Sequence, residues 1–252
     1  MILYNNRMRR ILLTISYDGH LYYGWQKQPN LKTIQGEIEE AFLRATGQKI
    51  EIFGSGRTDA GVHAYAQTAH FDTDVPIPVE KIMEILNNQL PPDIAIAEAR
   101  EVEEEFHARF SIKKKSYVYH ILNTPEKAPF DAYRYGFVKK PLDAGKMQEA
   151  ANLLIGTHDF RGFCSSQTSA TDFVRTIYDV RVEKLNDFML NVIVTGSGFL
   201  YNMVRIIVGT LVDYSHGKIT LEQIKDALEN GNRASAGQTM PPNGLYLLKT
   251  EY

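Results

Sequence analysis

Hydrophobic residues alternate with polar ones in several short stretches of the chain and recur at helical spacing between them. In the first part of the chain these patterns predict four strands, at residues 11–17, 50–53, 65–72 and 94–102. Between the strands, one helix is expected to begin after Thr33 and to end at Gly47, because these residue types cap helix ends. A second helix is expected after Pro78, so the predicted order is β-α-β-β-α-β.

The second part of the chain repeats this order. Its expected strands lie at 115–123, 175–185, 188–195 and 245–251. A helix is expected over 143–155, ending at Gly156, and another over 200–214. Thr220 followed three residues later by Gln223 is a capping-box pattern, which predicts the start of a further helix.

The repeated order predicts an α/β (α+β) protein of two halves. Split β-α-β units form antiparallel sheets with helices on one face, as in ferredoxin-like or RRM-like domains. The glutamate-rich run 101–105 is the expected boundary, which gives an N-terminal half at 1–105 and a C-terminal half at 106–252. If the two sheets join edge to edge, we expect the functional site in a central cleft at the junction.

The composition is that of a soluble globular protein. The 252 residues are 44% hydrophobic and 23% charged, and no apolar run approaches the roughly eighteen residues of a membrane span. The first ten residues place positive charge after a short apolar start, the wrong order for a signal peptide. The single Cys164 allows no intrachain disulfide and fits a reducing compartment, so we expect a cytoplasmic protein.

The charge balance alone does not indicate nucleic-acid binding. The formal net charge is -2, whereas nucleic-acid-binding domains are typically basic. Basic residues nevertheless gather in three short clusters, Arg7 with Arg9 and Arg10, Lys113–Lys115, and Lys139 with Lys140. A local positive face is therefore possible, although short clusters of this kind are equally common at solvated strand ends.

One glycine-rich run, Gly54–His63, has the character of a site. It places Arg57 and Asp59 among three glycines, which let the backbone approach another molecule closely. The run fits neither a P-loop nor a dinucleotide fingerprint. Asp beside Gly is also a common turn former, and a metal site of Asp59, His63 and His70 is conceivable although its spacing matches no recognised ligand motif.

Two further residues could act with Asp59. Arg205 lies in a helix that is apolar almost all round, where a buried guanidinium needs a partner. That partner is either a structural ion pair or Asp59, whose carboxylate it would keep ionised. Tyr117 and Tyr119 alternate in a strand beside Lys113–Lys115, so their rings share one face and serve either as core or to stack on a base.

Eight segments, in order from about residue 10 to 252, resemble the tRNA pseudouridine synthase A family. Gly-Arg-Thr-Asp at Asp59 together with Met-Val-Arg at Arg205 is the most specific pair. The segments are Tyr17-Asp18-Gly19, Gly24-Trp25-Gln26, Gly54 to Ala64, Phe106-His107-Ala108-Arg109-Phe110, the strand of Tyr117, Gly156-Thr157-His158-Asp159-Phe160, Phe199 to Gly209, and Pro242-Asn243-Gly244-Leu245.

The resemblance implies the pseudouridine synthase fold and a symmetric homodimer that isomerises uridines in the anticodon arm of tRNA without cofactor or metal. By the same resemblance Asp59 is the nucleophile, at either the base or the sugar, and Arg205 is its paired cation. Tyr117 would stack on the target base, Arg57 would lie near the RNA and could fill the space of the extruded base, and Leu245 would form an apolar floor.

Two other functions remain open on the sequence. A non-catalytic RNA-binding module would need stacking aromatics and basic strands but no Asp–Arg pair. A metal-dependent hydrolase would use Asp59, His63 and His70.

Overall fold

The protein is described by a computed structural model over residues 7–126 and 128–252, so the first six residues of the segment tested as a signal peptide lie outside the described part. The chain forms two units. One consists of Met1–Lys113 with Leu247–Tyr252, and the other of Lys114–Tyr246. The predicted halves, 1–105 and 106–252, differ from these units because the end of the last strand belongs to the first unit, and the domain boundary stays a prediction.

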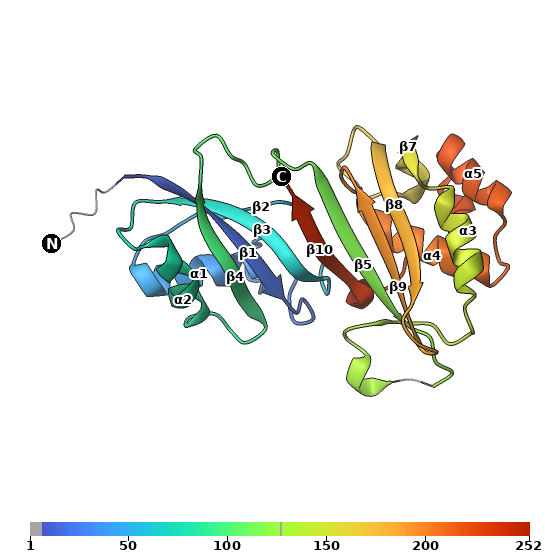
Figure 1. Cartoon of the computed structure of the whole chain (residues 1–252), viewed down its shortest axis with the longest axis horizontal. Coiled ribbons are helices and arrows are strands. Elements are labelled where there is room, and N and C mark those ends of the chain that lie inside the picture. Colours follow the sequence, from blue (N-terminus) through green and yellow to red (C-terminus); the bar gives the residue numbers. More distant parts are fainter. Residues whose placement is uncertain (1–6, 127) are drawn as a thin grey trace. The chain divides into compact units, whose positions relative to one another are not determined.

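The first unit has the predicted order β-α-β-β-α-β. Its elements are β1 (Arg9–Tyr17), α1 (Ile34–Thr46), β2 (Phe53–Gly54), β3 (His63–Thr73), α2 (Val79–Asn87) and β4 (Ile94–Val102) (Figure 1). Strand β1 pairs antiparallel with β3 on one side and with β4 on the other. The short β2 pairs with β3, and the strand order continues from β3 to β10 (Leu245–Glu251).

Local sequence explains most of these element ends. The Thr33 side chain accepts a hydrogen bond from the Gly36 N–H and begins α1, and Gly47 ends it with a φ of 77°. Helix α1 packs Phe42 edge-on against Phe71 of β3, with ring centroids 5.0 Å apart. The predicted strand at 50–53 was wrong in extent, because only Phe53 and Gly54 pair with β3.

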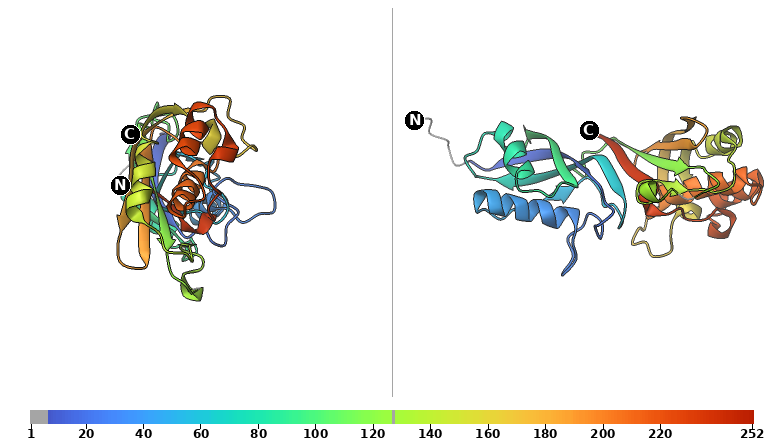
Figure 2. Two further views of the ribbon diagram at one scale, coloured as in Figure 1. Left: turned by 90° about the vertical axis from the view of Figure 1, so that its right-hand side faces the viewer. Right: turned by 90° about the horizontal axis from the view of Figure 1, so that it is seen from below.

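The second unit holds an antiparallel set of strands and three α-helices. Its elements are β5 (Lys114–Leu122), β6 (Gly136–Phe137), α3 (Ala144–Asn152), β7 (Gly156–Asp159), β8 (Val174–Lys184), β9 (Met189–Gly196), α4 (Met203–Ser215) and α5 (Leu221–Glu229). The strand order is β5-β9-β8-β7, and β6 adds to β5 in parallel. Helix α4 lies on one side of the strands in both views of Figure 2. The mixed α/β class expected from the sequence is confirmed.

The structure corrects one end of each of two predicted helices in the second unit and confirms the start of a third. Helix α3 ends at Asn152 instead of 155, and Gly156 does not cap it but opens β7, a strand that was not predicted, with a φ of 124°. Helix α4 begins at Met203 instead of 200, because Asn202 is left-handed with a φ of 61°. The capping box at the start of α5 is confirmed.

Over the described residues, no helix has the length and apolar character that crossing a membrane requires.

Candidate active site

The loop that follows β2 is held at its start by a buried glutamine of β3. The Ser55 N–H donates to the Thr68 carbonyl oxygen (2.8 Å), which continues the pairing of β2 with β3. The Ser55 hydroxyl donates to Gln67 Oε1 (2.6 Å), and Gln67 Nε2 donates to the Gly56 carbonyl oxygen (2.9 Å). The Gln67 side chain thus fixes two consecutive loop residues from a position with no solvent exposure.

The middle of the loop is held on both sides of Asp59. The Thr58 hydroxyl shares a buried hydrogen bond of 2.8 Å with the Tyr17 hydroxyl at the end of β1. The Trp25 N–H donates to the Thr58 carbonyl oxygen (3.0 Å), and the Val62 N–H donates to the Asp59 carbonyl oxygen (3.1 Å). The Asp59 backbone is therefore fixed, and its side chain is half-buried.

A second turn lies directly against this loop and explains two glycines outside it. At Gly24 the φ is 85°, and an added Cβ would come within 2.5 Å of the Thr58 carbonyl oxygen. At Gly19 an added Cβ would overlap the Val62 carbonyl oxygen. Only glycine allows such backbone contact, so the Tyr17-Asp18-Gly19 and Gly24-Trp25-Gln26 segments serve to support the Asp59 loop.

The two histidines of the hypothetical metal site each receive a backbone hydrogen bond. His63 Nδ1 accepts from the Gly19 N–H (3.1 Å), and His70 Nδ1 accepts from the Ala108 N–H (3.2 Å). Burial lowers the pKa of His70 to about 4, so its ring is neutral at pH 7. Within residues 7–126 and 128–252, no group of three or more His, Cys, Asp or Glu side chains is arranged to hold a metal ion.

In the second unit, neutral oxygens fix the guanidinium of Arg205 in α4. Arg205 Nε donates to the Met240 carbonyl oxygen (2.6 Å), and Nη1 donates to Asn202 Oδ1 (2.7 Å). The Met240 N–H returns a bond to the Arg205 carbonyl oxygen (3.2 Å). Asn202 is itself held, since its Nδ2 donates to the Ser165 hydroxyl (2.9 Å). The apolar helix around Arg205 is buried, as the sequence predicted.

Tyr117 and Tyr119 occupy alternate positions of β5 and are both buried. The Tyr117 ring lies edge-on to Phe199, with centroids 5.1 Å apart and an interplanar angle of 86°. The Tyr119 hydroxyl donates to the Pro241 carbonyl oxygen (2.8 Å), and burial raises its pKa. Leu245, the first residue of β10, is 7% exposed and stands four residues after Pro241.

The five predicted site residues divide between the units. Asp59 and the exposed Arg57 belong to the first unit, and Tyr117, Arg205 and Leu245 belong to the second. The pairing of Asp59 with Arg205 and the role of each residue toward RNA stay predictions.

Comparison with known proteins identifies the family. A family model described as tRNA pseudouridine synthase matches residues 13–111 and 150–252. The tRNA pseudouridine synthase A of Thermoanaerobacter sp. (strain X514) is 45% identical over 97% of this chain and 100% of its own length. That of Brevibacillus brevis is 48% identical over the same shares of both chains. The chain belongs to the tRNA pseudouridine synthase family.

As a tRNA pseudouridine synthase the chain is an isomerase, and the resemblance seen in its sequence is confirmed. The assignment rests on these sequence relatives. Solved structures align only weakly. The one titled "Crystal Structure of a Cbf5-Nop10-Gar1 Complex" has a TM-score of 0.37 at 12% identity, over 94% of this chain and 48% of its own. The one titled "Crystal structure of pseudouridylate synthase" has a TM-score of 0.32 at 12% identity, over 81% of this chain and 58% of its own.

Two supporting residues of this synthase were missed by sequence reasoning. Asn202 stands three residues before Arg205, one helical turn away, and this spacing could have marked it as a partner. Gln67 is a wholly buried amide in β3, and such a group must be hydrogen-bonded. Its partner, however, could not be read from the sequence.

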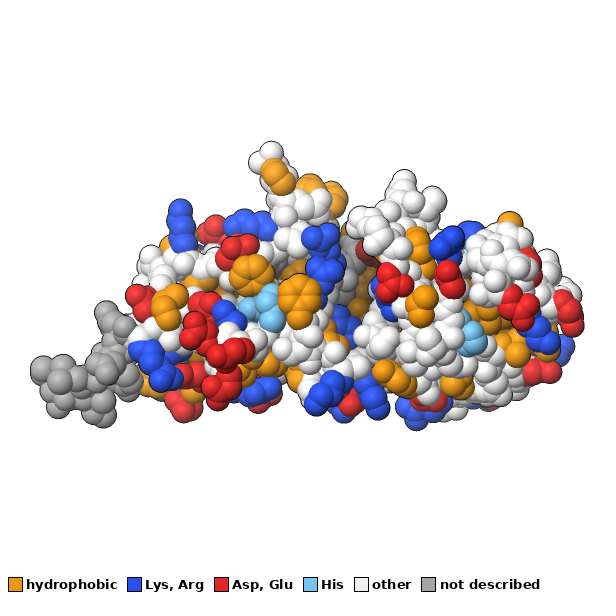
Figure 3. Space-filling model, turned by 90° about the horizontal axis from the view of Figure 1, so that it is seen from above, with side chains coloured by type: hydrophobic (Ala, Val, Ile, Leu, Met, Phe, Trp, Pro, Cys, Tyr) orange, Lys and Arg blue, Asp and Glu red, His pale blue; other side chains and the backbone are white. Residues whose placement is uncertain are grey.

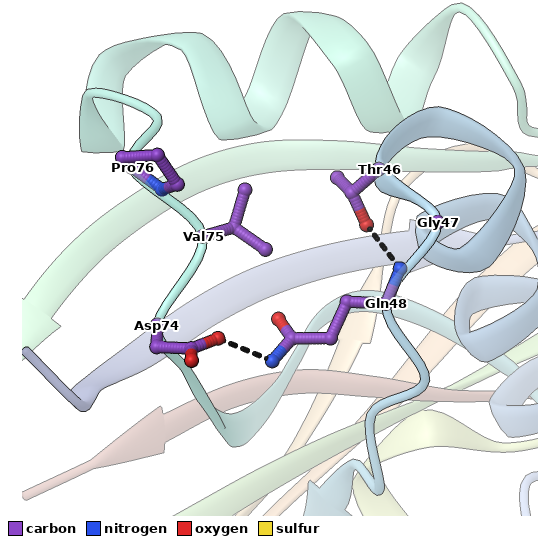
Figure 4. A pocket seen from close by; sticks show the side chains of 6 residues that line it. All are labelled: Thr46, Gly47, Gln48, Asp74, Val75 and Pro76. Carbon is purple, nitrogen blue, oxygen red and sulfur yellow. Dashed lines mark hydrogen bonds between the residues drawn. The ribbon is translucent and has the colours of Figure 1, made fainter. Parts of the chain in front are cut away.

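A pocket in the first unit lies at the end of α1, lined by Thr46, Gly47, Gln48, Asp74, Val75 and Pro76 (Figure 4). Gln48 Nε2 donates to Asp74 Oδ1 across it (2.6 Å), and the Gln48 N–H donates to the Thr46 hydroxyl (3.1 Å). None of the predicted site residues lines this pocket.

Proposed function

We propose that this synthase converts uridine to pseudouridine in the anticodon arm of tRNA, with Asp59 as its nucleophile. One observation carries the proposal: in a member of this family, Asp59 lies half-buried in a loop whose backbone is fixed on both sides of it. A reacting group must be held in one geometry to be effective. A carboxylate that is also partly shielded from water is a stronger nucleophile than a solvated one.

The reaction needs no second substrate. The bond between N1 of uracil and C1′ of ribose breaks, the uracil rotates, and a bond between C5 and C1′ forms. The hydrogen on C5 leaves as a proton, and N1 takes up a proton. No electron is gained or lost overall, which agrees with a reaction that consumes no cofactor. Attack by Asp59 on the base and attack on the sugar both satisfy this balance.

The other predicted residues supply what such a nucleophile requires. Arg205, fixed by Asn202 and Met240, would offer a cation to the Asp59 carboxylate. The Tyr117 ring would stack on the target base, and Leu245 would support the other side of that base. Arg57, exposed two residues before Asp59, would contact the RNA.

The assembly and location follow from the same proposal. The enzyme acts in the cytoplasm on tRNA as a homodimer, with no metal. With a net charge of -2, one copy offers little positive surface, and a two-fold dimer brings the basic clusters of two chains to one tRNA.

Replacing Asp59 tests the proposal. In the Asp59→Asn variant, release of tritium from tRNA that carries uridine labelled at C5 should fall by about 10³-fold or more, because the amide cannot attack. Binding of the same tRNA on a filter should persist. The matched control is Asp74→Asn, an exposed carboxylate of the same unit, which should release tritium at the wild-type rate.

The alternatives predict other results. A non-catalytic RNA-binding module would release no tritium even as wild type. Substantial turnover by Asp59→Asn, with wild-type turnover confirmed, would remove Asp59 from the nucleophile role. If dialysis of the wild-type protein against a chelator abolishes tritium release as Asp59→Asn does, the result would favour a metal-dependent reaction.

A further inference from the structure

Four aromatic rings form a continuous surface in the first unit. Phe53 of β2 stacks on His70 of β3, with centroids 5.3 Å apart and an interplanar angle of 24°. His70 meets His107 edge-on at 4.6 Å, and His107 meets Phe110 at 4.4 Å. We call this set of Phe53, His70, His107 and Phe110 the aromatic surface. His107 and Phe110 belong to the Phe106–Phe110 segment, to which the proposed reaction gives no role.

The backbone under the aromatic surface is fixed. The Ala108 N–H donates to His70 Nδ1 (3.2 Å), and the Ala108 carbonyl oxygen accepts from the Tyr252 hydroxyl (3.0 Å). The Arg109 N–H donates to His107 Nδ1 (3.1 Å). Ala108 has no solvent exposure. A segment held in this way keeps its exposed rings in place before any partner arrives, which lowers the entropic cost of binding.

The rings at the two ends of this surface are open to solvent. Phe110 is 77% exposed and Phe53 is 43% exposed, so both rings offer a face to a partner. Figure 3 shows hydrophobic side chains gathered around histidine, with Lys, Arg, Asp and Glu side chains close by. The guanidinium of Arg109 lies 5.8 Å from the centre of the Phe110 ring, and Lys113 is exposed.

The two histidines contribute as neutral rings. Burial lowers the pKa of both His70 and His107, and the positive charge of Arg10 lowers both pKa values further. The carboxylate of Asp72 acts in the opposite direction and raises the pKa of His70, but its effect is smaller. His107 is partly exposed, and its neutral imidazole can stack on a base without bringing a charge that needs solvation. The buried His70 ring supports Phe53 from beneath. Positive charge near these rings comes instead from Arg10, beside the two histidines, and from Arg109, beside Phe110.

The chain connects this surface directly to the candidate catalytic loop. Phe53 is followed by Gly54, the first residue of the Gly54–His63 run, and both pair with β3, opposite His70 and Ala69. A nucleotide on Phe53 would therefore lie beside the loop that holds Asp59.

We infer that the aromatic surface stacks unpaired bases of the anticodon loop, next to the uridine that reacts. The inference rests on the proposed function, because it takes tRNA as the ligand. Exposed rings flanked by cations suit single-stranded nucleic acid, where the rings stack on bases and the cations meet phosphates. A second copy of the chain fits less well, because two exposed phenylalanines supply far less than the roughly 800 Å² that each partner of a stable interface buries.

Fluorescence offers a direct test, because Trp25 is the one tryptophan of the chain and is 2% exposed. The Phe110→Trp variant gains an exposed indole on the aromatic surface. Stacking on a base should quench its emission when tRNA, or an isolated anticodon stem-loop, is added. The control is Phe188→Trp at the hairpin between β8 and β9, where Phe188 is 56% exposed, and its emission should not change.

Affinity gives an independent test. The Phe110→Ala variant should bind tRNA about 5- to 100-fold more weakly, the range expected from losing one base stacked on an aromatic ring. Phe110→Trp should bind as tightly as the wild type, and Phe188→Ala should show no loss. Because Phe110 is exposed, Phe110→Ala should keep the wild-type circular dichroism and melting temperature, so that weaker binding cannot come from unfolding.

The outcomes separate this inference from the proposed function. Wild-type affinity of Phe110→Ala with unquenched emission of Phe110→Trp overturns the inference, even when wild-type protein releases tritium from tRNA. Emission that changes with protein concentration in the absence of RNA assigns the surface to a second copy and also overturns it. Quenching by tRNA in a protein that releases no tritium upholds the surface and rejects the proposed reaction.

Discussion

Burial determines the charge of single residues in this synthase, and His70 shows it most clearly. The ring is 2% exposed, accepts the Ala108 N–H, and faces His107 and Arg10, with the Asp72 carboxylate also near. Burial is the largest cause that lowers its pKa, followed by His107 and Arg10. Protonation would place a second charge beside Arg10 and remove the acceptor that holds Ala108.

This arrangement predicts a pH-dependent stability. The folded pKa of His70 is about 4, and a histidine in the unfolded chain has a pKa of about 6.5. Between these values the unfolded state binds more protons, so the free energy of unfolding falls as the pH drops from 6.5 to 4. The glutamine of a His70→Gln variant cannot be protonated. Its free energy of unfolding should therefore fall less than that of the wild type over this pH range, by an amount on the order of 1 kcal/mol. Urea unfolding at pH 7 and pH 4.5 measures it, and the exposed His20→Gln is the control. Equal pH dependence in wild type and His70→Gln would contradict the shift.

At this scale the sequence predicted residue types better than partners. The apolar pattern over 199–209 predicted that the helix around Arg205 is buried, and it is. The oxygens that fix the guanidinium could not be predicted in full. Asn202 lies within one turn, but Met240 is 35 residues away and reaches Arg205 only through the fold.

At the scale of elements, the turn at residues 18–24 supports the Asp59 loop by backbone contact. Gly24 has a φ of 85°, and an added Cβ would lie 2.5 Å from the Thr58 carbonyl oxygen. Gly47, the cap of α1, has nearly the same φ, 77°, but nothing lies within 4 Å of an added Cβ. Substitutions at Gly24 and Gly47 therefore separate two contributions to the free energy of unfolding, that of a left-handed backbone and that of a displaced loop.

Gly24→Ala should lower stability more than Gly47→Ala does. Both changes should cost about 1 kcal/mol for the left-handed backbone. Only Gly24→Ala must also move Thr58, so it should cost a further 1 kcal/mol or more, of the order of overpacking, and reduce tritium release from labelled tRNA. Urea unfolding and the release assay measure the two effects. Equal activity of the two variants would show that the Asp59 loop does not depend on this turn.

Element boundaries show where sequence patterns stop being sufficient. Thr33, Gly47 and the Thr220–Gln223 box are local signals, and each ends or begins a helix as predicted. Gly156 carries the same kind of signal as Gly47, yet it opens β7, which exists only because β8 lies beside it. Pairing between distant segments decides such cases, and single-sequence patterns do not contain it.

At the scale of the whole molecule, the charge distribution limits how one chain can hold tRNA. The net charge is -2, and the expected basic cluster Lys113–Lys115 is smaller than it looked, since Lys115 is 8% exposed. Lys113 and Lys114 are exposed, and the Lys114 ammonium lies 5.0 Å from the centre of the Tyr178 ring. A single chain therefore sets 28 Lys and Arg side chains against 30 Asp and Glu side chains and has no net positive charge to attract tRNA.

A homodimer would double this positive surface for each tRNA bound. Light scattering without RNA should give twice the 28.6 kDa mass of the chain, and the mass should persist at micromolar concentration. Because phosphate contacts release counterions, tRNA affinity should fall steeply with salt, and Lys113→Gln with Lys114→Gln should reduce that slope without changing the mass. Lys218→Gln, which breaks an ion pair with Asp213 on α4, is the matched control for loss of a surface lysine. A mass of one chain, with full tritium release on dilution, would show that a single copy binds and modifies tRNA unaided.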